Sequence, residues 1–154
     1  MSAGPFNYRA AAPLLAGIFV VSIFVHSLWE QLQTFAYDCG ALSLNAFVVY
    51  HSLATLGDGG LMLVLYGAGW AIHRDPAWID AMTWRDLPWI AGLGGVLATG
   101  IEVRALTTGR WAYSEWMPVI PGLGVGLIPI LQLVLLPLPI FWTAARLVRR
   151  PRTV

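Results

Sequence analysis

Residues 13 to 37 read PLLAGIFVVSIFVHSLWEQLQTFAY, and this apolar stretch decides the fold. A helix of about 20 apolar residues is long enough to cross the hydrocarbon core of a bilayer. The stretch is too long for the core of a signal peptide, and no small-residue cleavage site follows it before Trp29 and Glu30. We therefore expect a retained transmembrane helix.

The composition is also that of a membrane protein. Hydrophobic residues make up 58% of the 154 residues and charged residues only 11%, against roughly 45–50% and 25% in soluble domains. The net charge of +1 argues against a nucleic-acid partner. The single Cys39 has no second cysteine for an internal disulfide. We expect one transmembrane domain over residues 1–154.

Three more apolar runs follow, at residues 46–72, 88–108 and 122–147. Turn-forming residues separate the first run from the second, and the polar segment from His73 to Asp86 separates the second from the third. The prolines inside the last run should kink that helix. The predicted fold is an all-α bundle of four transmembrane helices.

The arginines orient the chain, because positive charge collects on the cytoplasmic side of a membrane. Most of them lie before the first run, between the second and third, or after the fourth: Arg9, Arg74, Arg85, Arg146, Arg149, Arg150 and Arg152. Arg104 and Arg110 lie near the opposite end of the third run. We predict that both termini are cytoplasmic. The absence of a transit-type N-terminus fits a bacterial inner membrane.

Ionisable side chains within the spans are candidates for function, because they are costly to bury in a bilayer. His26 and Glu30 are four residues apart and share a helix face. His51 and Asp58 are seven apart, which is two turns of one face. The third and fourth runs contribute Glu102 and Gln132. In the predicted orientation, these groups lie in the non-cytoplasmic half and can converge on one pocket.

Such a pocket suits acid–base chemistry. Several carboxyl groups in a medium of low dielectric cannot all ionise, so at least one should hold a proton near neutrality. Together with an ionised carboxylate or neutral histidine, it forms the acid and base that move a double bond or start and quench a carbocation. The catalytic candidates are Glu30, His26, Asp58 and Glu102. The candidates for substrate binding are Trp29, His51, Trp111, Tyr113 and Gln132, since Trp faces can stabilise a cation.

Other readings of the same residues stay open. The polar groups can simply hold helices together, for example through an ion pair of Glu30 or Glu102 with Arg104. A metal site of His26, His51 and a carboxylate is possible by ligand type, but no HxxxH or HExxH spacing supports it. We predict neither a metal nor a cofactor.

The segment His26-Ser-Leu-Trp-Glu30, followed by Tyr37-Asp38, resembles the His-x-x-x-Glu helix of the emopamil-binding sterol isomerase family and the wider EXPERA group. Further blocks follow in that family's order: Gly57-Asp58, Glu102 with Thr-Gly-Arg-Trp-Ala-Tyr after it, and Gln132-Leu-Val-Leu-Leu-Pro137. The resemblance implies a four-helix membrane domain in which a buried His and carboxylates protonate a sterol double bond. The chain also looks like small bacterial membrane proteins without an assigned role.

The leading functional hypothesis is therefore a membrane-embedded isomerase or cyclase that acts by proton transfer on an isoprenoid-like substrate from the bilayer. One rival is a small proton-coupled transporter or ion-binding protein, in which the same groups work across a homodimer interface. Another is an accessory subunit of a membrane complex. A pocket that opens sideways to lipid favours the enzyme, a wet path to both surfaces favours transport, and an exposed Gly-rich face without a pocket favours the subunit.

Overall fold

The computed structural model describes residues 8–40 and 42–148, with side chains from residue 11 onward. The elements, in chain order, are α1 (Tyr8–Gln33), η1 (Thr34–Ala36), α2 (Leu44–His73), η2 (Trp78–Ala81), α3 (Leu87–Thr107), α4 (Leu127–Leu135) and α5 (Pro137–Val148). The described residues form helices and two isolated bridges, with no strand. The predicted all-α class is confirmed.

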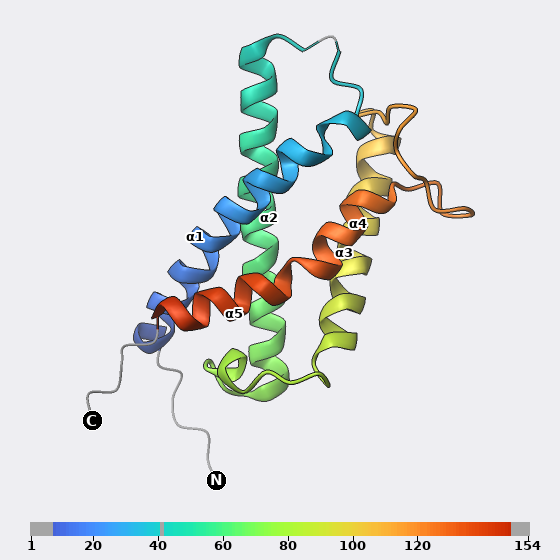
Figure 1. Cartoon of the computed structure of the whole chain (residues 1–154). Coiled ribbons are helices and arrows are strands. Elements are labelled where there is room, and N and C mark those ends of the chain that lie inside the picture. The colour runs from blue at the N-terminus through green and yellow to red at the C-terminus, as the bar shows by residue number, and fades with distance from the viewer. Residues whose placement is uncertain (1–7, 41, 149–154) are drawn as a thin grey trace.

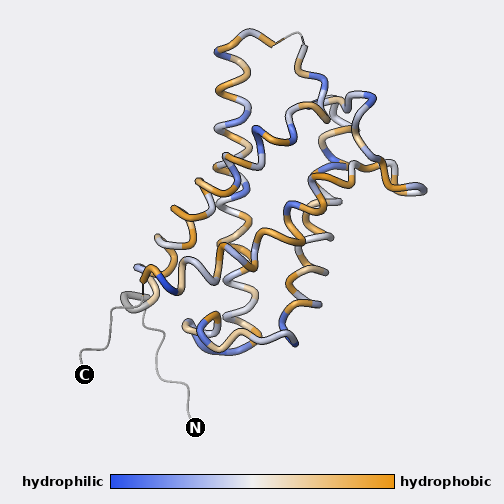
Figure 2. Tube along the Cα trace, viewed as in Figure 1, coloured by the Kyte–Doolittle hydropathy of each residue, from blue (hydrophilic) through white to orange (hydrophobic). Residues whose placement is uncertain are grey.

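Four segments are long and apolar enough to cross a membrane: Ala11–Ala36, Leu44–His73, Leu87–Thr107 and Leu127–Val148. Figure 2 shows hydrophobic residues along most of the length of these helices, with hydrophilic residues in the connections and at several places within the helices. The predicted orientation depends partly on Arg9, Arg149, Arg150 and Arg152, whose side chains lie outside the described residues. The chain is a helical membrane protein, and the cytoplasmic placement of its termini stays a prediction.

The fourth span differs from its expected start, because it begins at Leu127 and not at residue 122. Gly122 and Gly124 have φ values of +82° and +68°, a region that a helix does not use. The backbone instead turns back on itself, and the amide of Leu127 donates to the carbonyl of Pro118 at 2.7 Å. The expected interruption of this span occurs at Leu136, just before Pro137 starts α5.

The helices pack unequally around the bundle. In Figure 1, α1 begins and α5 ends at the same end of the bundle, and the α2–α3 connection lies there too. The helix α1 packs along α2 and α5, and α3 packs along α4, whereas α2 and α3 scarcely touch. The α3–α4 contact is so close that a Cβ on Gly94 would overlap the carbonyl oxygen of Leu133. The space between α2 and α3 is therefore the place where the bundle is least closed.

The end that holds the α2–α3 connection is filled by Trp78, which is 2% exposed. Its ring stacks on His73 at a centroid distance of 5.4 Å, and its Nε1 donates to the carbonyl of Tyr66 at 3.1 Å. His73 Nε2 lies 2.8 Å from Asp86 Oδ1. Burial alone would raise the pKa of the Asp86 carboxyl, but hydrogen bonds from Thr83, Trp89 and His73 outweigh it and hold this pKa below its usual value.

A glycine pair on α2 tests this packing. Gly69→Ala should lower the free energy of unfolding by about 1–3 kcal/mol, because its Cβ would overlap the Trp78 ring. Gly67→Ala is the matched control, since nothing lies within 4 Å of its Cβ, and it should leave stability unchanged or slightly raised. Thermal unfolding in detergent measures both. Equal unfolding temperatures for the two variants would contradict the role given to Trp78.

Candidate functional site

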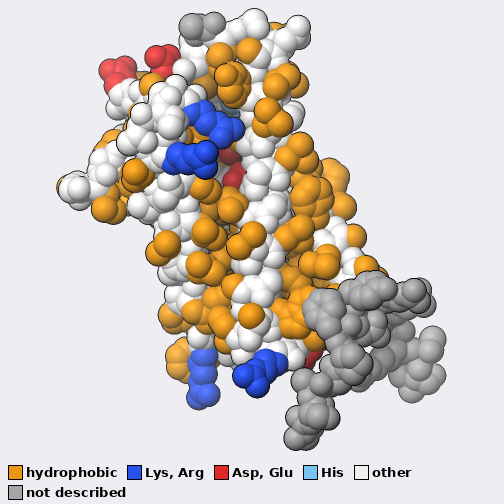
Figure 3. All heavy atoms as spheres, turned by 180° about the vertical axis from the view of Figure 1, so that it is seen from behind, with side chains coloured by type: hydrophobic (Ala, Val, Ile, Leu, Met, Phe, Trp, Pro, Cys, Tyr) orange, Lys and Arg blue, Asp and Glu red, His pale blue; other side chains and the backbone are white. Residues whose placement is uncertain are grey.

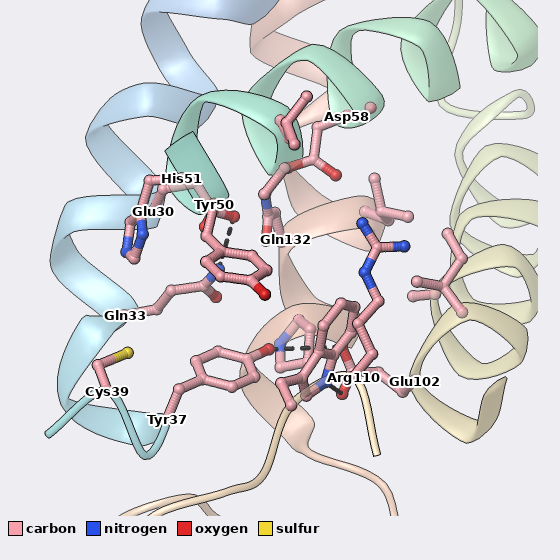
Figure 4. Close-up of a pocket in the computed structure, with 18 of the residues that line it drawn as sticks. Glu30, Gln33, Tyr37, Cys39, Tyr50, His51, Asp58, Glu102, Arg110 and Gln132 are labelled. Atoms are coloured by element: carbon pink, nitrogen blue, oxygen red, sulfur yellow. Dashed lines mark hydrogen bonds between the residues drawn. The ribbon is translucent and has the colours of Figure 1, made fainter. Parts of the chain in front are cut away.

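A cavity of about 460 Å³ lies at the other end of the bundle, a size typical of small-molecule sites. Residues from α1, α2, α3, α4 and both neighbouring connections line it (Figure 4). The polar and ionisable ones are Glu30, Gln33, Tyr37, Asp38, Cys39, Tyr50, His51, Asp58, Glu102, Arg110, Trp111 and Gln132. Apolar side chains, among them Leu61 and Leu133, complete its wall.

Glu30 enters the cavity from the last turn of α1. Its side chain is buried and accepts a hydrogen bond from Gln33 Nε2 at 2.8 Å. Gln33 in turn accepts one from Trp29 Nε1 at 2.9 Å. Trp29 is half-buried and does not line the cavity, so its contact with Glu30 is indirect. The i, i+3 and i, i+4 spacings of a helix produce this chain of three side chains.

Gln132 on α4 joins polar groups of α1 and α2. Its Nε2 lies 2.8 Å from His26 Nδ1 and donates to Asp58 Oδ2 at 2.7 Å. His26 Nδ1 itself lies 3.5 Å from Asp58 Oδ2. His26 is fully buried behind the cavity wall, whereas Asp58 lines the cavity with its side chain 17% exposed. One amide thus connects a hidden histidine with an accessible carboxyl group.

Glu102 on α3 is held by three aromatic donors. Tyr37 donates to Oε1 at 3.4 Å, Trp111 donates to Oε2 at 3.3 Å, and the Tyr113 hydroxyl also donates to Oε2. Burial, with Glu102 close by, raises the pKa of Tyr37 far above its ordinary value, and burial with the Glu102 hydrogen bond raises that of Tyr113. Both phenols therefore stay protonated and act as donors at neutral pH.

The segment from Arg110 to Pro121 covers the end of the cavity and is tied to the end of α1. Ser114 donates through its amide to Ala36 at 3.0 Å and through its hydroxyl to the carbonyl of Phe35 at 2.6 Å. The Tyr113 hydroxyl also accepts from the amide of Gly126 at 2.8 Å, although Tyr113 does not line the cavity. These bonds make the segment a fixed wall of the site.

His51 lines the cavity but makes none of its hydrogen bonds to a carboxylate. Its Nε2 lies 3.2 Å from Thr34 Oγ1, its Nδ1 lies 3.1 Å from the carbonyl of Phe47, and its ring stacks on Phe47. Its place on the same face of α2 as Asp58 therefore does not give it the same partners. Within the described residues, no group of three His, Cys, Asp or Glu side chains could hold a metal ion.

The cavity opens sideways, between α2 and α3. Leu53, Gly57 and Ile101 line it and are also exposed on the outside of the bundle. Figure 3 shows acidic side chains between the helices on this face, below two cationic side chains. Arg110 lines the cavity, with its guanidinium 5.5 Å from the Trp111 ring centre. In a bilayer, this opening would face the lipid chains.

The structure brings most of the predicted site residues together. Those that line the cavity are Glu30, Asp58, Glu102, His51, Trp111 and Gln132, while His26, Trp29 and Tyr113 contact it through a neighbour. The sequence reasoning missed Tyr50 and Arg110. Tyr50 carried a usable signal, because it lies two helical turns before Gly57 on one face of the predicted second helix, but Arg110 follows a helix end and has no periodic pattern.

Fold and site together define a four-span helical membrane protein with a buried acid cluster beside a lateral opening. Compared with known proteins, the chain matches no protein-family model, no curated protein and no solved structure. The likeness to the emopamil-binding and EXPERA proteins therefore stays a prediction.

Tyr113→Phe tests the fixed wall. The change removes the donor to Glu102 and the acceptor for Gly126, so it should lower the free energy of unfolding by about 1–3 kcal/mol. It should also speed amide hydrogen exchange in the Arg110–Pro121 segment. Tyr50→Phe is the control, because Tyr50 lines the same cavity and its side chain is exposed. Unchanged exchange in Tyr113→Phe would show that other contacts fix the wall.

Proposed function

We propose that the protein is a membrane-embedded isomerase or cyclase that moves protons on an apolar, isoprenoid-like substrate. The observation that carries this proposal is the lateral cavity, in which carboxyl groups from three helices face one space that apolar side chains also line. An apolar substrate would pass from the bilayer between α2 and α3 without crossing water. The site would hold it by burying its surface, as small-molecule pockets do.

Among the three carboxyl groups, Glu30 and Asp58 are the best candidates for the acid and the base of the reaction. Glu102 makes three hydrogen bonds to aromatic donors, so much of its accepting capacity is already used. Asp58 and Glu30 each have fewer partners and line the same cavity. One would give a proton to a carbon of the double bond and the other would remove a proton from a neighbouring carbon. The number of protons is conserved, so the isomerisation needs no redox cofactor.

The aromatic side of the cavity supports the carbocation that this reaction forms. Trp111 lines the cavity and is held in place by its bond to Glu102, and Tyr37 meets it edge-on at a centroid distance of 6.2 Å. A Trp face attracts a cation by about 0.5–2 kcal/mol, and the ionised form of Glu102 would add to this attraction. Glu102 would then serve the reaction as a fixed charge, and His26 would act through Gln132.

The half of the bundle that holds the α2–α3 connection favours an enzyme over a transporter. The described residues there form a core of buried apolar side chains around Trp78, Met62 and Phe141. Such a core favours the enzyme, because a transporter needs polar groups along the whole way across the membrane. We place the protein in a bacterial inner membrane, where an isoprenoid substrate would reach the opening from the lipid.

Deuterium exchange tests the acid–base roles. Protein in lipid nanodiscs made with D₂O is mixed with farnesol, geranylgeraniol, squalene or a sterol with a ring double bond, and mass spectrometry follows deuterium uptake and double-bond position. At least one substrate should exchange. Glu30→Gln and Asp58→Asn should each reduce the rate by about 100-fold or more, as expected for the loss of an acid or base.

Glu115→Gln is the matched control for exchange, because Glu115 is an exposed acid outside the cavity, and it should keep the wild-type rate. Native mass spectrometry of the purified protein adds an independent reading of the substrate class. A defined apolar molecule should co-purify and change in amount or form in Glu30→Gln. Bulk phospholipid alone, together with no exchange on any olefin, would contradict the enzyme and make proton flux in liposomes the next measurement.

Two glycines of α2 test the lateral opening. Nothing lies within 4 Å of a Cβ at Gly57 or Gly60, so both accept a larger side chain. Gly57→Leu places that side chain in the cavity lining, whereas Gly60 does not line the cavity. Gly57→Leu should therefore reduce binding of a fluorescent isoprenoid by about tenfold or more, which corresponds to about 1.4 kcal/mol, and Gly60→Leu should not. Equal binding by the two variants would place the entrance elsewhere.

A further inference from the structure

Gln132 is the side chain on which the polar groups of two other helices meet. Besides its bonds to His26 and Asp58, it interacts with Glu30, which lies beside it in Figure 4. Gln132 is 3% exposed and His26 is 0% exposed. Water therefore competes little with these contacts, and the state of one group must affect the others.

The atoms of this cluster define where its protons lie. An amide nitrogen only donates, so Nδ1 of His26 must accept and the ring must carry its proton on Nε2. Asp58 Oδ2 accepts from the same amide nitrogen, which suits the ionised carboxylate. His26 Nε2 is buried and is the one such side-chain atom without a hydrogen-bond partner in the described part of the chain. This arrangement leaves the histidine proton unsatisfied.

Turning the Gln132 amide by half a turn gives a second arrangement of the same atoms, since amide oxygen and nitrogen have nearly the same shape. The oxygen Oε1 would then accept from a protonated Asp58 and from His26 Nδ1–H. Asp58 gains one proton, and the histidine proton moves from Nε2 to Nδ1. The turned amide nitrogen is free to donate to Glu30, which favours the ionised form of that carboxylate.

We propose that Gln132 is a positioning residue whose amide turns when Asp58 gains a proton and then holds Glu30 in its ionised form. This inference rests on the proposed function, because an isomerase needs one acid and one base in the same site. The chargeable groups around Gln132 are His26 and Glu30 from α1, Asp58 and His51 from α2, Glu102 from α3 and Arg110 from the connection after α3. Glu102 and His51 bond to other partners. The turn of the Gln132 amide therefore changes the protons of His26, Asp58 and Glu30 only.

The experiment follows both protons in the full chain in nanodiscs, without substrate. Nitrogen-15 NMR reports the tautomer of His26, and infrared spectroscopy reports the protonated carboxyl groups, with Asp58→Asn and Glu30→Gln used to assign the bands. In the wild type, His26 should change from Nε2–H to Nδ1–H at the pH at which Asp58 gains its proton, while Glu30 stays ionised. In Gln132→Met, the His26 and Asp58 transitions should separate by about one pH unit or more.

Gln33→Met is the matched control, because Gln33 is a second buried glutamine whose side chain bonds to Glu30 and Trp29 and, within the described part of the chain, to neither Asp58 nor His26. The two transitions should stay together in that variant. A His26 tautomer that does not change while Asp58 is protonated would overturn the proposal, and so would constant signals from both groups over the whole pH range. The wild-type measurement tests the proposal even if the Gln132→Met variant does not fold. This measurement does not depend on catalytic turnover. If an olefin takes up deuterium but the His26 and Asp58 transitions are not coupled, the role of Gln132 is refuted and the proposed enzyme activity is not.

Discussion

A polar side chain inside a bilayer has no water to bond to, so each one in a span must find its partner within the protein. In this bundle, the amide of Gln132 meets that need for two helices besides its own, because it bonds to His26 of α1 and Asp58 of α2. This one side chain therefore connects α1, α2 and α4 at this level. Among the residues that the structure describes, no such bond joins α3 to α2, and the cavity lies between these two helices.

The space between the helices is occupied differently at the two ends of the bundle. At the end with the α2–α3 connection, Gly69 leaves room for the ring of Trp78, and a large aromatic side chain fills the space between helices. At the other end, many of the side chains that line the cavity are polar and pair with one another, beside apolar ones such as Leu61 and Leu133. Polar pairs hold the helices apart without filling the space between them, so this end contains a cavity.

The helices and much of the acid cluster follow from the sequence, because apolar length predicts a span and the spacing of His26 and Glu30 places them on one face. Contacts between elements do not follow in this way. The bonds from Trp111 and Tyr113 to Glu102 depend on the path of an irregular segment, and the late start of α4 depends on two glycines with positive φ. Periodicity also cannot say that His26 lies behind the cavity wall, since that depends on how α1 is rotated against α4.

The three carboxyl groups of the site differ because their neighbours differ, although all line the same cavity. Glu102 uses its lone pairs on donors that also fix the wall, so a change in its charge would disturb the structure around it. Asp58 and Glu30 accept hydrogen bonds from glutamine amides. A side-chain amide can turn, so it can bond to the carboxyl group in either protonation state. A reaction that returns every proton it uses needs only this pair and no path to the second surface. The closed aromatic core below the cavity is therefore in keeping with the chemistry that we propose.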